Sequence, residues 1–283
     1  MSNRKLGWAV GLTLGVAIFM FSGCKKGQPQ SPVLPPASSA SPSRSLHHGL
    51  PRVYALTYPL AYLADRVGGH VVEIASFSTD EDSAVRRIVE SLTDEDLVLA
   101  NSKDILSKLR KAGVNESAIA EVPPISGSST AVADFDLARR QADAICDALQ
   151  KKLPEQIELF ALNYNLVQTE LLGLDLRAQK ASQRMKGRPV LAPSSAFMPW
   201  AERYHWDFHC ILSDQERQQE LVRQISKNTA PVVLISDQVQ SGKAPDPKVE
   251  VLHLDSCLEA PSKGDWLSIM KRNVERLEAL KAP

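Results

Sequence analysis

The sequence predicts an α/β protein with two lobes, each a small, mostly parallel sheet with flanking helices, joined by a long rigid connecting helix. Short β-rich apolar runs alternate with segments of helical periodicity from residue 53 to about 122, and again from 189 to 254. Such alternation is typical of parallel sheets. Between these regions, apolar residues recur at helical spacing with almost no strand signal.

The first lobe is expected over residues 48–133. A strand over 53–57 leads into a helical pattern that ends at Gly68 and Gly69, and glycine commonly follows the end of a helix. The later elements alternate in the same way, with strands expected at 70–77, 96–100 and 119–122 and helices at 82–92 and 103–112.

The connector is expected over residues 134–186 and the second lobe over 187–283. In the connector only Pro154 and Gly173 interrupt the periodicity, and proline is tolerated in the first turn of a new helix. Strands are expected at 189–192, 206–212, 232–236 and 249–254, and helices at 197–204, 214–227 and 266–280. Two lobes joined in this way are expected to bind a ligand in the cleft between them.

The N-terminus has the order of a secretory signal. Two basic residues precede an apolar stretch over residues 6–21, and Cys24 follows two small residues. The stretch is shorter than the roughly 20 residues that a membrane-spanning helix needs, and the cysteine resembles the lipobox of bacterial lipoproteins. We expect residues 1–23 to be a signal peptide and Cys24 to carry a lipid. The alternative, an uncleaved N-terminal anchor, also places the protein in the cell envelope, facing the periplasm or the exterior.

Residues 24–47 are rich in Pro, Ser, Ala and Gln, with few large apolar residues. Such a segment cannot bury enough apolar surface to order itself, so we expect a tether. The 33 basic and 33 acidic residues of the chain cancel and form no long run of one sign. A nucleic-acid partner is therefore not expected.

Three further cysteines, Cys146, Cys210 and Cys257, belong to a compartment that permits disulfides. Cys210 and Cys257 could pair while Cys146 is buried on a helix. Equally, all three could be unpaired buried thiols, because sequence does not give the Cα separations on which a disulfide depends.

Four segments stand in a familiar order along the chain. They are Thr57-Tyr58-Pro59-Leu60 before Gly68-Gly69, then Leu92-Thr93-Asp94-Glu95-Asp96-Leu97-Val98, then Leu153-Pro154-Glu155 with Phe160 and Asn163, then Trp266-Leu267-Ser268-Ile269-Met270 with Asn273. Together they resemble the cluster A-I solute-binding proteins that deliver zinc or manganese to ABC importers. The resemblance implies an ABC permease as partner and a divalent metal ion as the transported ligand.

In that family three histidines and one carboxylate hold the metal, and the resemblance places other residues at these positions. The histidine positions fall at or near Asp80, Thr130, and the pair Ser194 and Ser195. The carboxylate position falls at Asp237, although a shifted register would place Ser236 there. Asp237 is therefore the one metal ligand of the family that we expect here.

The chemistry of this ligand set differs from that of a zinc site. Zinc normally takes four ligands, mostly imidazole or thiolate, whereas these positions offer hydroxyl and carboxylate oxygens. Oxygen ligands suit harder cations or a hydrogen-bonded ligand. Asp80 and Ser194 have a second interpretation, because acidic residues and serines before a helix also cap its N-terminus, where an anion can bind as well.

The six histidines lie away from the ligand positions of the family, and we expect them to be structural or exposed. They are His47, His48, His70, His205, His209 and His253. A second group, Tyr58, Trp200, Tyr204 and Trp206, could line the cleft, but large aromatic residues are more often part of a core.

The interpretation that accounts for most of the sequence is a monomeric, membrane-anchored solute-binding lipoprotein with an ABC permease as partner and a histidine-poor cleft. The alternative is a degenerate binding-protein fold that recognises another envelope protein without transporting metal. Neither a Gly-x-Ser-x-Gly motif nor a partnered Ser, His and Asp arrangement is present, so we do not expect an enzyme.

Overall fold

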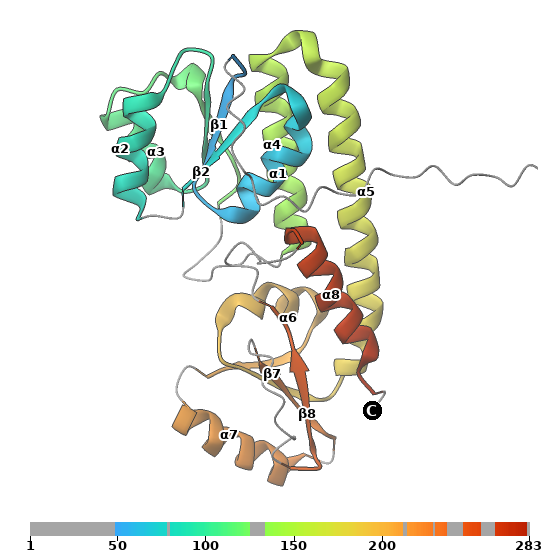
Figure 1. Ribbon diagram of the computed structural model, residues 1–283. Helices are drawn as coiled ribbons and strands as arrows, with labels where there is room; N and C mark the ends of the chain where they lie inside the picture. Colours follow the sequence, from blue (N-terminus) through green and yellow to red (C-terminus); the bar gives the residue numbers. More distant parts are fainter. Residues whose placement is uncertain are drawn as a thin grey trace, which may run out of the picture. The chain divides into compact units, whose positions relative to one another are not determined.

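The computed structural model describes residues 49–77, 80–124, 134–211, 214–228, 230–236, 246–255 and 264–281. Within them lie two four-stranded sheets, in each of which every neighbouring pair of strands is parallel (Figure 1). Helices flank both sheets. The predicted α/β class with two lobes is confirmed.

The first sheet has the strand order β2-β1-β3-β4. Its strands are β1 (Arg52–Ala55), β2 (Glu73–Ser76), β3 (Leu97–Ala100) and β4 (Ile119–Glu121). The expected strand over 70–77 is shorter in the structure, because a 3₁₀ turn, η1 (Gly69–Val71), occupies its start. Gly69, at φ 61°, ends the preceding helix in a conformation that disfavours other residues.

The two faces of this sheet pack on different helices. Helices α2 (Glu81–Ser91) and α3 (Lys103–Lys111) cover one face, where Tyr54, Val85 and Leu109 belong to a separate buried cluster. The other face packs on α1 (Tyr58–Gly68), which in turn contacts two long helices that follow in the chain. A short 3₁₀ turn, η2 (Glu116–Ala118), leads into β4.

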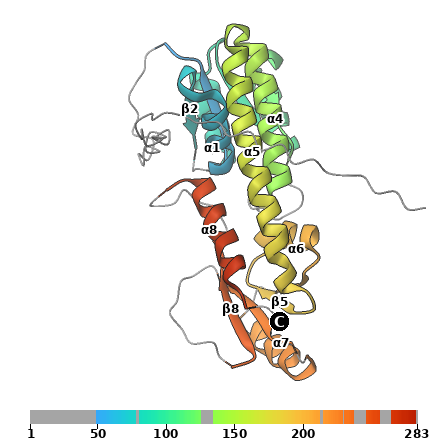
Figure 2. The same ribbon diagram turned by 90° about the vertical axis from the view of Figure 1, so that its right-hand side faces the viewer.

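The connector is a pair of helices. Helix α4 (Phe135–Lys152) ends where Pro154 opens a 3₁₀ turn, η3 (Pro154–Gln156), and α5 (Ile157–Ser182) follows. The two helices lie side by side in both views (Figures 1 and 2). Only α5 is the long connecting helix, with 26 residues and thus a length of about 39 Å. A short turn, η4 (Gln183–Met185), leads from it into the second lobe.

The second sheet has the strand order β6-β5-β7-β8. Its strands are β5 (Pro189–Ala192), β6 (Asp207–Cys210), β7 (Val232–Ser236) and β8 (Val249–His253). Its helices are the turn η5 (Ser195–Phe197), α6 (Met198–Tyr204), α7 (Asp214–Lys227) and α8 (Trp266–Ala279). These elements agree with the predicted ones to within a few residues at their ends, where helices and strands commonly fray.

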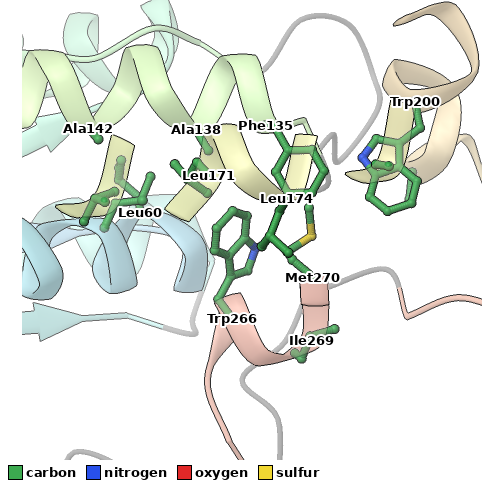
Figure 3. Close-up of a cluster of buried hydrophobic side chains, with 14 of the residues drawn as sticks. Leu60, Phe135, Ala138, Ala142, Leu171, Leu174, Trp200, Trp266, Ile269 and Met270 are labelled. Carbon is green, nitrogen blue, oxygen red and sulfur yellow. The ribbon is translucent and has the colours of Figure 1, made fainter. Parts of the chain in front are cut away.

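One buried apolar cluster extends through both lobes. Phe135 at the start of α4 stacks on Trp200 of α6, with ring centroids 5.7 Å apart. Tyr62 of α1 meets Trp266 at the start of α8, also at 5.7 Å. Leu174 of α5 lies beside Phe135 and Met270, and Leu171 lies nearer to Ala138 and Leu60 (Figure 3). The aromatic residues are therefore core, as their type predicts: Trp200 and Trp206 are buried, and Tyr58 and Tyr204 pack against the same cluster.

A buried carboxylate also ties α5 to the second lobe. Asp175 is 5% exposed and accepts hydrogen bonds from Arg203 Nε at 2.8 Å and from Tyr204 Oη at 2.7 Å. Burial alone would raise the pKa of Asp175, but these hydrogen bonds outweigh it and hold the pKa below its usual range. The carboxylate therefore stays charged inside the core. Nearer the solvent, Arg177 donates to both carboxylate oxygens of Glu278 at 2.9 and 2.8 Å.

We expect Asp175→Ala to lower the free energy of unfolding by about 2–3 kcal/mol, because Arg203 and Tyr204 would lose their shared acceptor. The estimate lies below that for a fully buried pair because the Arg203 side chain is 37% exposed. The control is Glu278→Ala, which removes the exposed ion pair between Glu278 of α8 and Arg177 of α5. This loss should cost about 1 kcal/mol or less. Urea unfolding measures both, and equal losses would contradict a structural role for Asp175.

Candidate functional site

The segments that follow the strand ends of the two sheets face one another. In parallel sheets, ligands bind outside the carboxyl ends of the strands. Tyr62 lies on the helix that follows β1, and Trp266 opens the helix that follows β8. Phe135 opens the first helix after β4, and Trp200 lies on the helix after β5. Because Tyr62 meets Trp266 and Phe135 meets Trp200, the candidate site lies between the carboxyl edges of the two sheets.

Asp80, the first predicted site residue, lies four residues beyond the end of β2. Its carboxylate accepts a hydrogen bond from the Ser83 amide at 2.9 Å and so caps the N-terminus of α2. This bond, the largest cause, holds the pKa of Asp80 below its usual range, so the side chain is anionic. Asp80 is exposed, and a carboxylate has several acceptor sites. Capping therefore leaves oxygen lone pairs for a ligand.

Ser194 and Ser195 follow the carboxyl end of β5. Ser194 Oγ accepts from the Ala196 amide at 3.1 Å and caps the turn η5. Both serines are half-buried, while Ala196 and Phe197 beyond them are buried. Ser194 is thus a cap at the carboxyl edge of the second sheet, the position where the family resemblance places a metal ligand.

The other predicted positions lie outside the described residues. These are Thr130, Asp237, the lipidation residue Cys24 and the disulfide candidate Cys257. The same holds for residues 1–23 and 24–47, the expected signal peptide and tether. Among the helices that the structure does describe, none combines the length and apolar character needed to cross a membrane.

One histidine lies closer to the site than its place in the sequence suggests. His253 ends β8 and pairs in register with Ser236 at the end of β7, directly before Asp237. Among the residues that the structure describes, the buried Nδ1 atom of His253 has no hydrogen-bond partner. The pairing of β7 with β8 places His253 beside Ser236, and this pairing is the signal that could have indicated His253 from the sequence. Across the described ranges, however, no three His, Cys, Asp or Glu side chains are grouped so that they could hold a metal ion.

The two described cysteines are thiols. Cys146 is buried on α4, as expected, and its Sγ donates to the Phe160 carbonyl oxygen at 3.7 Å. Burial raises the pKa of Cys146 to about 11, which suppresses the reactive thiolate. Cys210, at the end of β6, is half-buried with its pKa also raised by burial, and it forms no disulfide with a described residue.

A cavity of about 620 Å³ lies beside the end of β6, away from the predicted ligand residues. It is lined by His209, Cys210, Ile211, Glu216, Gln219, Glu220 and Arg223. Glu220 and Arg223, three residues apart on α7, pair with each other, and this hydrogen-bonded contact lowers the pKa of Glu220 to about 2. Asp80, Ser194 and Ser195 do not line the cavity, so it is separate from the site predicted between the lobes.

Two α/β lobes with parallel sheets are joined by one long helix, and the carboxyl ends of their strands face one another. This arrangement defines the class of two-lobed solute-binding proteins. Residues 53–280 match the sequence model of the family described as zinc-uptake complex component A, periplasmic. The chain belongs to this family of metal-binding solute-binding proteins of ABC importers, which are binding components rather than enzymes. Members of the family are periplasmic or extracellular lipoproteins that work with an ABC permease. The resemblance seen in the sequence is confirmed.

Several solved structures share this fold. The metal-dependent lipoprotein YcdH from Bacillus subtilis is 16% identical with a TM-score of 0.63, over 81% of this chain and 98% of that one. The Zn(II)-bound ZnuA-like domain of Streptococcus pneumoniae AdcA has 16% identity and a TM-score of 0.62, over the same shares. The laminin-binding protein Lbp of Streptococcus pyogenes has 16% identity and a TM-score of 0.60, again over 81% and 98%. No curated protein matches the sequence. At such identities the likeness shows the fold alone.

We expect Ser194→Ala to lower the free energy of unfolding by about 1 kcal/mol, because the Ala196 amide would lose its capping acceptor. Ser195→Ala is the matched control, since Ser195 is not the acceptor of that amide, and it should cost about 0.5 kcal/mol or less. Urea unfolding of the two variants measures both losses in free energy of unfolding. A larger loss for Ser195→Ala would show that the cap is not the dominant role of this pair.

Proposed function

We propose that this protein is a lipid-anchored solute-binding component of an ABC importer, whose cleft binds its solute through oxygen atoms in place of the histidines of the family. One observation carries the proposal. The family match spans residues 53–280, yet the described residues at the positions where the resemblance places its histidines, Asp80, Ser194 and Ser195, offer only oxygen atoms.

These oxygen atoms belong to both lobes, as a site between the lobes requires. Asp80 follows a strand of the first sheet, and Ser194 and Ser195 follow a strand of the second. Thr130 and Asp237 would complete the set, by resemblance to the family. A tetrahedral zinc site needs nitrogen or sulfur ligands that this set does not supply. Hydroxyl and carboxylate oxygens suit a harder divalent cation or a solute that donates hydrogen bonds.

The mode of binding follows from the packing between the lobes. The contacts of Phe135 with Trp200 and of Tyr62 with Trp266 are part of one buried cluster with α5. Opening the lobes widely would expose these rings to water, which is unfavourable. Ligand binding is therefore expected to cause only modest movement of the lobes.

A second candidate function is supported by the capping bonds. Asp80 and Ser194 each accept a backbone hydrogen bond, so a local structural role accounts for both without any ligand. On this alternative the protein keeps the binding-protein fold and recognises another envelope protein. Genes for an ATPase and a permease beside its own gene would favour import, and their absence would favour the alternative.

We expect zinc to leave the thermal midpoint of the chelator-stripped protein unchanged, because no histidine set holds it. A metal at a hundred times its dissociation constant adds about 2.7 kcal/mol, roughly 5–10 °C for a domain of this size. Manganese, iron, calcium and magnesium are added separately to the chain from residue 24 with Cys24→Ser, and a transported cation among them would produce a shift of that size. Asp237→Ala should abolish such a shift.

The opposite result would be a clear rise in midpoint with zinc that Asp237→Ala removes, which contradicts an oxygen-only site. If none of the five metals shifts the midpoint, delivery of these metals is excluded, and organic solutes are screened in the same assay.

We expect Cys24→Ser to move the protein from the membrane fraction to the soluble fraction, because Cys24 is the proposed lipid attachment site. Cys210→Ser is the matched control and should leave the protein on the membrane, since this thiol lies in the folded body. Fractionation of cells followed by blotting gives the distribution. Membrane retention of the Cys24→Ser protein would support the uncleaved N-terminal anchor.

A further inference from the structure

The outward face of α5 is unusually apolar. Leu162, Leu166, Leu172 and Leu176 are exposed by 60%, 54%, 42% and 57%. Between residues 157 and 180 the charged side chains classed as exposed are Glu158, Glu170 and Lys180. A helix face that meets water usually carries many more charges than this. Figure 2 shows this helix on the side that faces the viewer.

The core does not need these leucines. The opposite face of α5 packs in the buried cluster with Phe160, Val167, Leu171, Leu174 and Ala178. Helix α5 therefore carries apolar residues on two opposite faces, and an apolar helix face is normally covered. We refer to Leu162, Leu166, Leu172 and Leu176 as the leucine face.

The leucine face is symmetric about Thr169. Leu166 and Leu172 lie three residues to either side of it, and Leu162 and Leu176 lie seven residues to either side. At 100° per residue all four lie within about 60° of the direction of Thr169. A two-fold axis beside Thr169 would pair α5 with its own copy in antiparallel orientation. Each residue would then lie level with its mirror position on the copy, which is the pattern of an isologous interface.

The charges at both ends fit the same symmetry. Glu158 and Lys180 each lie eleven residues from Thr169, and each is exposed without an ion pair among the described residues. In the antiparallel pair, Glu158 of one copy would lie level with Lys180 of the other, once at each end. Opposite charges thus meet at both ends of the apolar seam, which selects this register over shifted ones.

The centre and the rim of the face also suit close contact. The Thr169 hydroxyl donates to the Asn165 carbonyl oxygen at 2.8 Å, so it brings no unpaired donor to the axis. Gly173, four residues away, is exposed and leaves open space for a side chain of the copy. At the rim, Glu170 is already paired with Arg66 at 2.6 Å. The interface would therefore bury no uncompensated charge.

We propose that the leucine face is the contact surface for a second copy of this chain, with the two α5 helices antiparallel about Thr169. The protein is then a two-fold dimer, in place of the monomer expected from its sequence. An unrelated partner would require an apolar stripe. It would not require leucines and end charges that are symmetric about a single residue. The symmetry therefore identifies the occupant as the chain itself.

The test is oxidative cross-linking of the full chain in the cell envelope. Thr169→Cys places two thiols beside the two-fold axis, so copper phenanthroline should convert most of the chain to a disulfide-linked dimer on a non-reducing gel. Gln179→Cys is the matched control: it is exposed on the same helix, but its two copies would lie about 30 Å apart. The unmodified chain corrects for the native cysteines.

Charge reversal in the Thr169→Cys background checks the register. Glu158→Lys should lower the dimer yield about threefold to tenfold through repulsion by Lys180 of the copy, and adding Lys180→Glu should restore it. Both residues are exposed, and an unchanged urea midpoint shows that the fold is intact. The proposal would be overturned by equal cross-linking at positions 169 and 179, or by a dimer yield that the charge reversals do not change. It would also be overturned by a disulfide between Thr169→Cys and a different protein.

Discussion

Helix α5 and the apolar cluster around it are the constraint on which the rest of the structure depends. Helix α5 packs on α1 and α4 and also on α8, the last helix of the second lobe, so it joins the helices of the two lobes. The cluster is continuous from Val53 in the first strand to Leu280 after the last helix. Burial of this surface is the main favourable term in folding, so the two lobes are stabilised together rather than one by one.

This arrangement separates the scaffold from the ligand residues. The elements that fill the cluster are strands and helices, whereas the predicted ligand positions all follow strand ends. Cores accept many apolar sequences as long as volume and pattern are kept, which explains how solved relatives share the fold at 16% identity. A site that depends on four side chains has no such tolerance. The proposed exchange of its histidines for oxygen-bearing residues would change the ligand chemistry and leave the packing intact.

Polar groups reinforce the same helix from the second lobe. Asp175 accepts from α6, and Arg188, 1% exposed at the start of β5, donates to the Pro231 carbonyl oxygen at 3.0 Å and to Glu250 at 2.7 Å. Both charges are buried with partners, as a low-dielectric interior requires. Asp175 joins α6 to α5, and Arg188 joins the residues before β5 and β7 to β8 within the second sheet. The opposite side of α5 keeps an apolar face that the described residues leave uncovered.

The sequence by itself determined the fold class, the order of the elements and the family, because hydrophobic periodicity and the glycines and prolines at the ends of elements are local signals. It also predicted Asp80 and Ser194 at strand ends, and the structure describes both there as caps. Tertiary structure alone decided that the two helices of the connector pack side by side, that His253 lies beside Ser236, and that the leucines of α5 divide between core and surface. These outcomes depend on which distant segments pack together. A periodic pattern shows that a helix side is apolar, but only packing determines whether that side is covered.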